Sequence, residues 1–223
     1  MAVAGIQVKI CGIRQAGDAE YAQTCGADYI GMIHFPKSPR YVVLDEISGI
    51  LPAIAPGKRV VVTVEPEIEL VEKLLNAGAD YLQIHLRSIE LTRIQEWSSL
   101  VTPDRLWLAP KLPPGEAFPE ELLPYAKTML IDTYSKDVHG GTGKTGDWQG
   151  FRNLVSNYPD TRFILAGGLN PGNVRQALEA SGATAIDVGS GVEAQPGIKD
   201  REKIAALFRQ LEADSRVRND KTA

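Results

Sequence analysis

Eight short runs rich in apolar and β-branched residues recur along this chain of 223 residues, and segments with helical periodicity lie between them. Such runs, bounded by glycine, proline and polar residues, are typical of buried strands. Strands that alternate with helices indicate parallel βαβ units. The predicted strands are Gln7–Ile10, Tyr29–Ile33, Arg59–Val64, Tyr81–Ile84, Leu106–Ala109, Thr128–Ile131, Phe163–Ala166 and Ala185–Val188.

Helix signals support the same organisation. The predicted helices are Ala16–Thr24, Glu67–Asn76, Pro171–Ala180 and Asp200–Glu212, with Asn170 and Asp200 as caps of the last two. The phrases "CGADYIG", "NAGADYLQ" and "ASGATAIDVG" repeat one pattern of helix end, glycine turn and strand. In this pattern the glycine is expected to adopt the left-handed conformation that ends a helix.

An array of eight such units in a chain of this length predicts an α/β fold. We expect a single-domain (β/α)8 TIM barrel with a closed, parallel, eight-stranded sheet, in preference to an open doubly wound sheet. The barrel is expected to span residues 1–213, and residues 214–223 to form a polar tail that frays. The proline-rich segment 111–124 is expected to be the loop after the fifth strand, leading into a short helix.

The composition excludes several classes of function. A hydrophobic fraction of 43% and a net charge of -4 are ordinary for a globular protein and argue against a nucleic-acid partner. No apolar stretch reaches the roughly 18 residues of a membrane span, and no export signal is evident. We therefore expect a cytoplasmic protein. There Cys11 and Cys25 should be reduced thiols, with Cys25 packed in the outer layer.

Polar residues gather where the predicted strands end. Cys11 ends the first strand, His85 follows the fourth, Asp132 follows the sixth, and Asp187 lies on the eighth. In a barrel of this kind the chemistry lies at the carboxyl ends of the strands. Strand ends can also be polar because they reach solvent, and a free cysteine is often a small buried residue. The occurrence of all four at one face favours an active site.

Two glycine-rich loops predict a phosphate site. "AGGLNPGNV" joins the seventh strand to its helix, and "VGSGVE" leaves the eighth strand. Glycines let backbone N–H groups approach an anion, and these two loops form the recurrent phosphate site of such barrels. The expected phosphate-binding residues are Gly168, Gly189, Ser190 and Gly191.

A third glycine-rich segment, "VHGGTGKTGDW" at 138–148, does not match the nucleotide-binding P-loop, because Val138 stands where that motif begins with glycine. We expect a flexible loop after Asp132, which either closes over a bound substrate or is a mobile surface loop without a partner. His34, His85 and His139 show no metal-ligand spacing, so no metal site is predicted.

Taken together and in order, several segments resemble the phosphoribosylanthranilate isomerase family of tryptophan biosynthesis. They are "KICGIR", "GADYIGMIHFPKSPRYV", "LIDT", "GGTGKTGDW", "ILAGGLNPGNV" and "IDVGSGVEAQPGIKD", and the resemblance extends from about Val8 to Leu211. It implies a TIM-barrel enzyme without cofactor or metal. The implied reaction is an Amadori rearrangement, an aldose–ketose isomerisation, of N-(5-phosphoribosyl)anthranilate. It also implies a phosphorylated small-molecule substrate; whether the protein is a monomer or a homodimer stays open.

The resemblance also implies roles for individual residues. Asp132 would be the general acid and Cys11 the general base. Arg40 would bind the anthranilate carboxylate, a role for which a planar guanidinium suits better than an ammonium group. Asp187 would contact the substrate amine or hydroxyls, and His85 would line the site.

From the residues themselves, Lys9 should share a face of the first strand with Cys11, because side chains two apart point the same way. Lys9 is expected to favour the Cys11 thiolate and to pair with Asp187. Desolvation is expected to raise the pKa of Asp132. Five residues depart from the family pattern: Gly189 where serine is frequent, Leu86 where glycine is common, and His34, Thr63 and Glu65. The alternatives are another phosphosugar isomerase and a catalytically silent barrel that binds a phosphorylated ligand.

Overall fold

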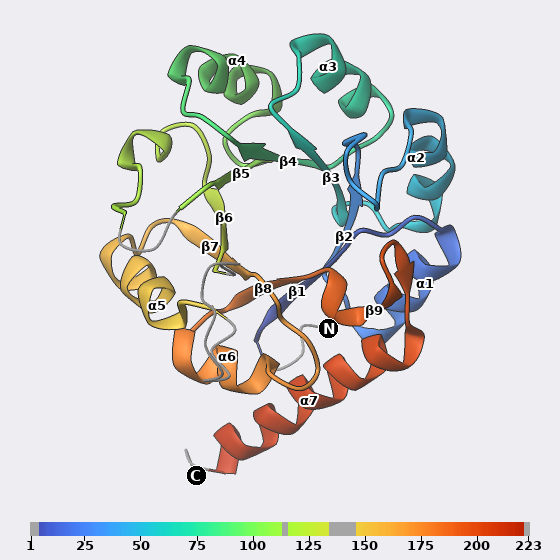
Figure 1. Cartoon of the computed structure of the whole chain (residues 1–223), viewed down its shortest axis with the longest axis vertical. Helices are drawn as coiled ribbons and strands as arrows, with labels where there is room; N and C mark the ends of the chain where they lie inside the picture. Colours follow the sequence, from blue (N-terminus) through green and yellow to red (C-terminus); the bar gives the residue numbers. More distant parts are fainter. Residues whose placement is uncertain (1–4, 113–115, 134–145, 221–223) are drawn as a thin grey trace.

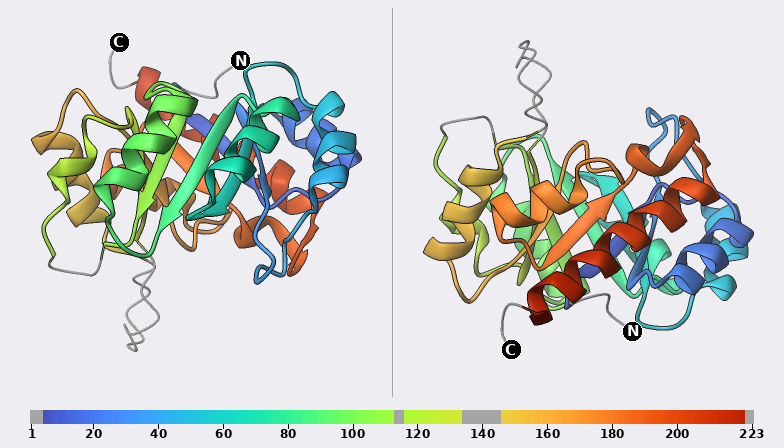
Figure 2. Two further views of the ribbon diagram at one scale, coloured as in Figure 1. Left: turned by 90° about the horizontal axis from the view of Figure 1, so that it is seen from above. Right: turned by 90° about the horizontal axis from the view of Figure 1, so that it is seen from below.

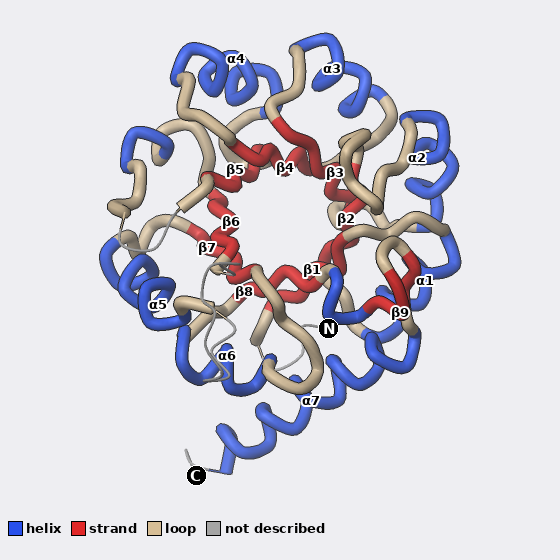
Figure 3. The backbone as a smooth tube through the Cα atoms, viewed as in Figure 1, coloured by secondary structure: helices blue, strands red, loops and turns tan. Residues whose placement is uncertain are grey.

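A computed structural model describes residues 5–112, 116–133 and 146–220 of the chain. Eight parallel strands, β1 to β8, close into a barrel in the order of the sequence (Figures 1 and 3). The predicted fold is therefore confirmed. The strands are β1 (Gln7–Cys11), β2 (Tyr29–Ile33), β3 (Arg59–Val64), β4 (Tyr81–Leu86), β5 (Leu106–Pro110), β6 (Thr128–Asp132), β7 (Arg162–Ala166) and β8 (Ala185–Val188).

Helices surround the barrel, as Figure 1 shows. They are α1 (Ala16–Cys25), α2 (Leu44–Ile50), α3 (Ile68–Asn76), α4 (Leu91–Val101), α5 (Trp148–Asn157), α6 (Val174–Ser181) and α7 (Arg201–Asp220). Three 3₁₀ turns are η1 (Leu51–Ala53), η2 (Glu120–Leu122) and η3 (Ser190–Val192). The short helix expected after the fifth strand is the turn η2. Within the described ranges, no helix combines the length and apolarity needed to span a bilayer.

The loop before α6 differs from the prediction. We expected a helix from Pro171 with Asn170 as its cap, but α6 begins at Val174 and its N-cap is Asn173. The Asn170 side chain instead accepts a hydrogen bond from the backbone N–H of Gly172 at 2.8 Å. This side-chain turn holds the backbone out of the helix for three residues, as asparagine commonly does.

Helix punctuation elsewhere follows the sequence. Gly26, Gly78 and Gly182 have φ values of 113°, 106° and 67°, the left-handed conformation predicted for the repeated turn. Asp200 caps α7, because its Oδ1 accepts hydrogen bonds from the N–H groups of Glu202 and Lys203. The helix then continues to Asp220, beyond the predicted end at Glu212.

A small hairpin rises beside the mouth of the barrel. It pairs β9 (Glu193–Gln195) with β10 (Ile198–Lys199) in antiparallel fashion and connects β8 to α7. Figure 2 shows this hairpin next to the loop that follows β2, both at the same end of the barrel. The two touch, because a Cβ placed on Gly197 would lie 2.9 Å from the carbonyl oxygen of Pro39.

Two apolar layers hold the fold. The larger lies between sheet and helices and includes the partly buried Cys25, as predicted. The smaller fills the barrel interior. At its amino end the Cζ atom of Arg162 lies 5.1 Å from the ring centre of Tyr29 and 5.2 Å from that of Trp107. These bulky groups fill the amino end of the barrel interior, opposite the strand ends that carry Cys11 and Asp187.

Candidate active site

The four polar residues predicted at strand ends come together on one face. Cys11, His85, Asp132 and Asp187 lie at or near the carboxyl ends of β1, β4, β6 and β8. Alternation along the strands places all four on the side that faces the barrel interior. Cys11 is buried, and both cysteines are free thiols. The sequence therefore located the mouth of the barrel correctly.

An ion pair lies directly beneath the thiol. Lys9 Nζ is 2.9 Å from Asp187 Oδ1, and the two side chains are 1% and 10% exposed. This confirms the predicted pairing. Lys9 and Cys11 also share a face, because a Cβ on Gly31 would lie 2.9 Å from Lys9 Cε and 3.0 Å from Cys11 Sγ. The missing side chain of Gly31 leaves the room that both groups occupy.

The charges around Cys11 oppose one another. Burial raises the pKa of the Cys11 thiol, the negative charge of Asp187 raises it further, and Lys9 lowers it. The net effect is a raised pKa, so Lys9 acts in the predicted direction but is outweighed. Burial lowers the pKa of Lys9, yet Asp187 and Cys11 more than compensate, and its pKa is raised. Lys9 is therefore an ammonium ion at neutral pH.

His85 is held as a neutral ring. Burial, helped by the nearby charge of Lys9, lowers its pKa to about 4. The Nε2 atom of His85 lies 3.0 Å from the side-chain nitrogen of Gln83. Since the amide nitrogen can only donate, we assign the imidazole proton to Nδ1. Gln83 was not predicted as a site residue; its place two residues before His85 on the same face of β4 was the available signal.

Leu86, one of the departures from the family pattern, does not line the interior. Its side chain belongs to the apolar layer between sheet and helices, and it is 4% exposed. A larger residue at this position is accommodated outside the barrel, so it does not alter the face on which His85 lies.

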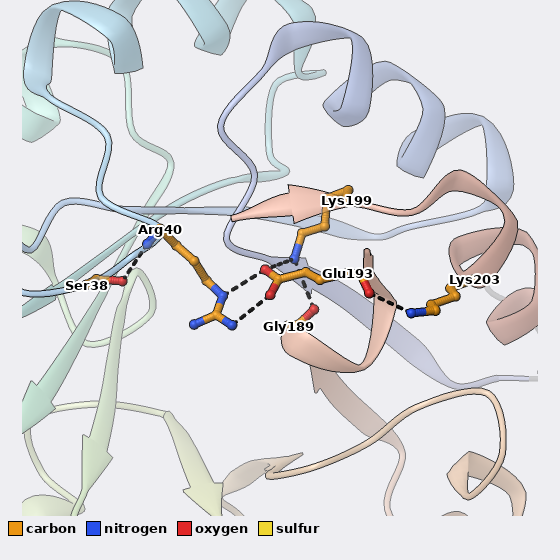
Figure 4. Close-up of polar contacts among 6 residues, drawn as sticks. All are labelled: Ser38, Arg40, Gly189, Glu193, Lys199 and Lys203. Carbon is orange, nitrogen blue, oxygen red and sulfur yellow. Dashed lines mark hydrogen bonds and ion pairs between the residues drawn. The ribbon is translucent and has the colours of Figure 1, made fainter. Parts of the chain in front are cut away.

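Arg40 lies in the loop after β2 and is held by an acidic partner from the hairpin. Its Nε and Nη2 atoms lie 2.7 Å from Oε1 and from Oε2 of Glu193 (Figure 4). Lys199 Nζ lies 3.0 Å from Oε1 of the same carboxylate. Burial raises the pKa of Glu193, but its hydrogen bonds with Arg40 and Lys199 outweigh this and hold the pKa below its usual value. Glu193 is thus a carboxylate.

Sequence reasoning missed Glu193 and Lys199. Both stand in "GVEAQPGIKD", but in this part of the chain the sequence predicted only Gly189, Ser190 and Gly191 as site residues. The same arginine explains Gly12, which has a φ of +79° and whose Cβ would lie 2.6 Å from Arg40 Cδ. Any other residue at position 12 would displace the arginine.

The predicted phosphate loops lie next to each other. The Gly168 carbonyl accepts hydrogen bonds from Asn170 Nδ2 and Asn173 Nδ2 at 3.1 and 3.0 Å. A Cβ on Gly191 would collide with the carbonyl oxygen of Leu169, so the two loops are in contact. Gly189 and Ser190 begin the turn η3, the kind of short extra helix at which these barrels bind phosphate. A cavity of about 700 Å³ adjoins both loops and is lined by Asn170, Ser190, Gly191 and residues of α7.

Part of the predicted site lies outside the described residues. The expected substrate-covering loop at 138–148 is described only from Gly146 onward, and His139 is likewise outside. Asp132 is exposed in the described structure. Across the described ranges, no cluster of three or more His, Cys, Asp or Glu side chains could hold a metal ion.

Comparison with known proteins identifies the family. A family model described as N-(5'-phosphoribosyl)anthranilate (PRA) isomerase matches residues 8–210. The chain belongs to the phosphoribosylanthranilate isomerase family. The member from Aquifex aeolicus is 35% identical over 213 residues, covering 94% of this chain and all of its own. The member from Pseudomonas savastanoi pv. phaseolicola is 36% identical over 215 residues, covering 92% and 97%.

Solved structures of phosphoribosylanthranilate isomerases share the fold. The enzyme from Thermotoga maritima has a TM-score of 0.73 and 31% identity, covering 93% of this chain and 99% of its own. TrpF from Jonesia denitrificans has a TM-score of 0.78 and 28% identity, covering 94% and 98%. A third, with a TM-score of 0.72 and 28% identity, covers 93% and 99% and is in complex with reduced 1-(o-carboxyphenylamino)-1-deoxyribulose 5-phosphate. The resemblance seen in the sequence is confirmed, and the protein is an isomerase of this family.

Proposed function

We propose that this protein converts N-(5-phosphoribosyl)anthranilate to 1-(2-carboxyphenylamino)-1-deoxyribulose 5-phosphate, with Asp132 as general acid and Cys11 as general base. The observation that carries the proposal is the placement of these two groups on the interior face, at the carboxyl ends of the non-adjacent strands β6 and β1. A substrate lying across the barrel mouth can meet an acid on one side and a base on the other.

The reaction then needs two proton transfers. Asp132 gives a proton to the ribose ring oxygen, the C1–O bond breaks, and the lone pair of the amine nitrogen forms a C=N iminium ion. The Cys11 thiol loses its proton to solvent, the resulting thiolate removes the proton from C2, and the C–H electrons neutralise the iminium to give an enolamine. C1 takes up a proton while the C2 hydroxyl gives one up, which leaves the ketone. Atoms and charge balance, as an isomerisation requires.

The raised pKa of Cys11 fits this order of events. In the free protein, burial and Asp187 disfavour the thiolate. Ring opening creates a positive charge on the substrate close to the thiol, and a positive charge nearby lowers the pKa of a thiol. The product of the acid-catalysed step therefore increases the fraction of Cys11 present as the thiolate, the form that acts as the base, immediately before it must act.

The remaining predicted residues bind the substrate in this proposal. Arg40 binds the anthranilate carboxylate, Asp187 contacts the amine or the sugar hydroxyls, and His85 lines the site. The phosphate rests on backbone groups of the two loops, at Gly168, Gly189, Ser190 and Gly191. We propose that the protein works in the cytoplasm as a monomer or homodimer, with no nucleic-acid partner.

The test is an assay with freshly prepared phosphoribosylanthranilate that follows the loss of its fluorescence. We expect turnover by the wild type and a decrease of 10²- to 10⁴-fold, the usual contribution of a general acid or base, in Asp132→Asn and in Cys11→Ala. Wild-type protein that binds the substrate without turnover would instead favour the silent phosphate-binding barrel. Full turnover by Asp132→Asn would refute the acid assignment alone.

A further inference from the structure

Among the described residues, one edge of the Arg40 guanidinium is bound, and its partner is Glu193. A guanidinium has five N–H donors in a planar fork. Glu193 takes one donor from Nε and one from Nη2. No acceptor for Nη1 is found among the residues that the structure describes. The edge formed by Nη1 and Nη2 is therefore available for a second carboxylate, and the Arg40 side chain is 22% exposed.

The residues around Glu193 leave a net positive charge on Arg40. By itself, the Glu193 carboxylate would neutralise Arg40. Lys199 adds a second cation to the same carboxylate, so two positive charges face one negative charge. The Glu193 and Lys199 side chains are only 4% and 1% exposed, which shields their contact from water and salt. The net positive charge is thus carried by the group that reaches solvent, Arg40.

Hydrogen bonds from Lys199 and Lys203 also hold the backbone of the hairpin and of the phosphate loop that follows β8. Lys199 Nζ donates a hydrogen bond to the Gly189 carbonyl at 3.0 Å, and Lys203 Nζ donates to the Glu193 carbonyl at 2.7 Å. Figure 4 shows Arg40 and Lys199 approaching the Glu193 carboxylate from two sides. The hairpin therefore joins the arginine and the phosphate loop in one rigid arrangement.

We propose that Glu193, supported by Lys199, is a positioning residue that orients Arg40 so that its Nη1–Nη2 edge receives the carboxylate of the substrate. Glu193 itself does not contact the substrate. The inference rests on the proposed function for the identity of the ligand. It adds the requirement that recognition of the carboxylate depends on a buried side chain 153 positions away in the sequence.

Two stable ligands separate this role from general structural damage. One is N-(5-phosphoribityl)anthranilate, a reduced analogue that cannot react; the other is N-(5-phosphoribityl)aniline, which lacks only the carboxylate. Calorimetry gives the ratio of their affinities. We expect the wild type to prefer the first ligand and Glu193→Gln to decrease this preference by about tenfold to a hundredfold, the usual effect of a charged hydrogen bond. Affinity for the aniline ligand should fall by a smaller factor than affinity for the anthranilate ligand, because the aniline ligand reports only the coupling of the hairpin to the phosphate loop.

Further variants keep the test decisive. Glu193→Asp retains the charge on a shorter side chain, and we expect a smaller loss of preference than in Glu193→Gln; it also serves if the glutamine variant does not fold. In an Arg40→Met background, Glu193→Gln should produce no further loss of preference, because Glu193 acts through Arg40.

The outcomes are distinct. A wild type that prefers the anthranilate ligand, with variants that keep that preference undiminished, overturns the positioning role while the proposed function stands. A further loss of preference in the Arg40→Met background also overturns it. Equal wild-type affinity for both ligands overturns the assignment of Arg40 and this inference, while turnover in the fluorescence assay still decides the proposed function separately.

Discussion

Lys9 Nζ lies 2.9 Å from Asp187 Oδ1 inside the barrel, and the two charges act on Cys11 in opposite directions. Asp187 disfavours the thiolate and Lys9 favours it. Because the two charges neutralise each other, burial decides the outcome and the free enzyme holds a protonated thiol. Each charge of the pair offsets the effect of the other, so the removal of one of them should shift the pKa of Cys11.

Removing either charge should shift the reactivity of Cys11 in opposite directions. Lys9→Met is expected to raise the pKa of Cys11 further, and Asp187→Asn to lower it. The measurement is the rate of alkylation of Cys11 as a function of pH in a Cys25→Ser background. Lys9→Met should also destabilise the protein by about 3–5 kcal/mol, because it leaves a buried carboxylate without its partner.

A matched control is the double variant Lys9→Met with Asp187→Asn, which removes both charges. Its alkylation profile should lie between those of the two single variants. If all four proteins show the same profile, the pair does not control the thiol and is only a structural contact.

Gly31 should be intolerant of even one added carbon. In Gly31→Ala the new methyl group would meet Lys9 Cε at 2.9 Å and Cys11 Sγ at 3.0 Å. We expect a loss of about 1–3 kcal/mol from overpacking and a decrease in turnover of at least tenfold from the displaced base. The measurements are urea denaturation and the fluorescence assay.

Gly49 offers the control for this substitution. It lies in α2, and a Cβ there would meet nothing within 4 Å. Gly49→Ala should therefore leave turnover unchanged and stabilise the protein by about 0.5–1 kcal/mol, since alanine favours a helix. Equal effects of the two substitutions would contradict a specific role for Gly31.

The strand ends could be predicted because the physical signal is local. An apolar run stops where the strand leaves the core, so Cys11 and Asp132 could be placed from the sequence, and the closed sheet brought them to one face. The contact between Arg40 and Glu193 could not be predicted in this way, because it spans 153 positions and depends on how two loops meet. Lys199 lies only six positions from Glu193, but their contact depends on the pairing of β9 with β10, which the sequence analysis did not predict.

The sequence analysis did not predict the helix α4, although a local signal for it was present. The buried side chains of α4 are Ile94, Trp97, Ser98 and Val101, which follow the helical spacing i, i+3, i+4 and i+7. The polar Ser98 within this set, and polar residues between its members such as Gln95 and Glu96, hid this pattern. In contrast, the start of α6 depended on the side-chain turn of Asn170, which propensity alone does not reveal.

Gly12 should matter through Arg40. Gly12→Ala forces a left-handed backbone on alanine and also pushes a Cβ to 2.6 Å from Arg40 Cδ. Gly57 has nearly the same φ, +80°, with nothing within 4 Å of its Cβ. Both substitutions should destabilise the protein by about 1 kcal/mol through backbone strain.

Only the substitution at Gly12 should also raise the KM for phosphoribosylanthranilate, by about tenfold or more, as a displaced charged hydrogen bond does. The measurement is steady-state kinetics of the two variants beside the wild type. An unchanged KM in Gly12→Ala, or an equal rise in Gly57→Ala, would show that the contact between Gly12 and Arg40 does not serve binding.

His85 should make the folded protein sensitive to acid. Its pKa is lowered to about 4 in the folded state, mainly by burial, whereas an unperturbed histidine titrates near 6.5. Between these values the unfolded chain binds a proton that the folded protein does not, so stability rises with pH from about 4 to 6.5 and is constant above. At about 1.4 kcal/mol per pH unit, acidification across this window costs up to about 3.5 kcal/mol.

Urea denaturation of the wild type and of His85→Gln between pH 4 and pH 7.5 tests this. The carboxylates common to both proteins cancel in the difference between their free energies of unfolding. That difference should shift in favour of the wild type as the pH rises to about 6.5 and then level off, because only the wild type carries the titrating ring. A difference that stays constant across the window would mean that the folded protein accepts a proton on His85 as readily as the unfolded chain does.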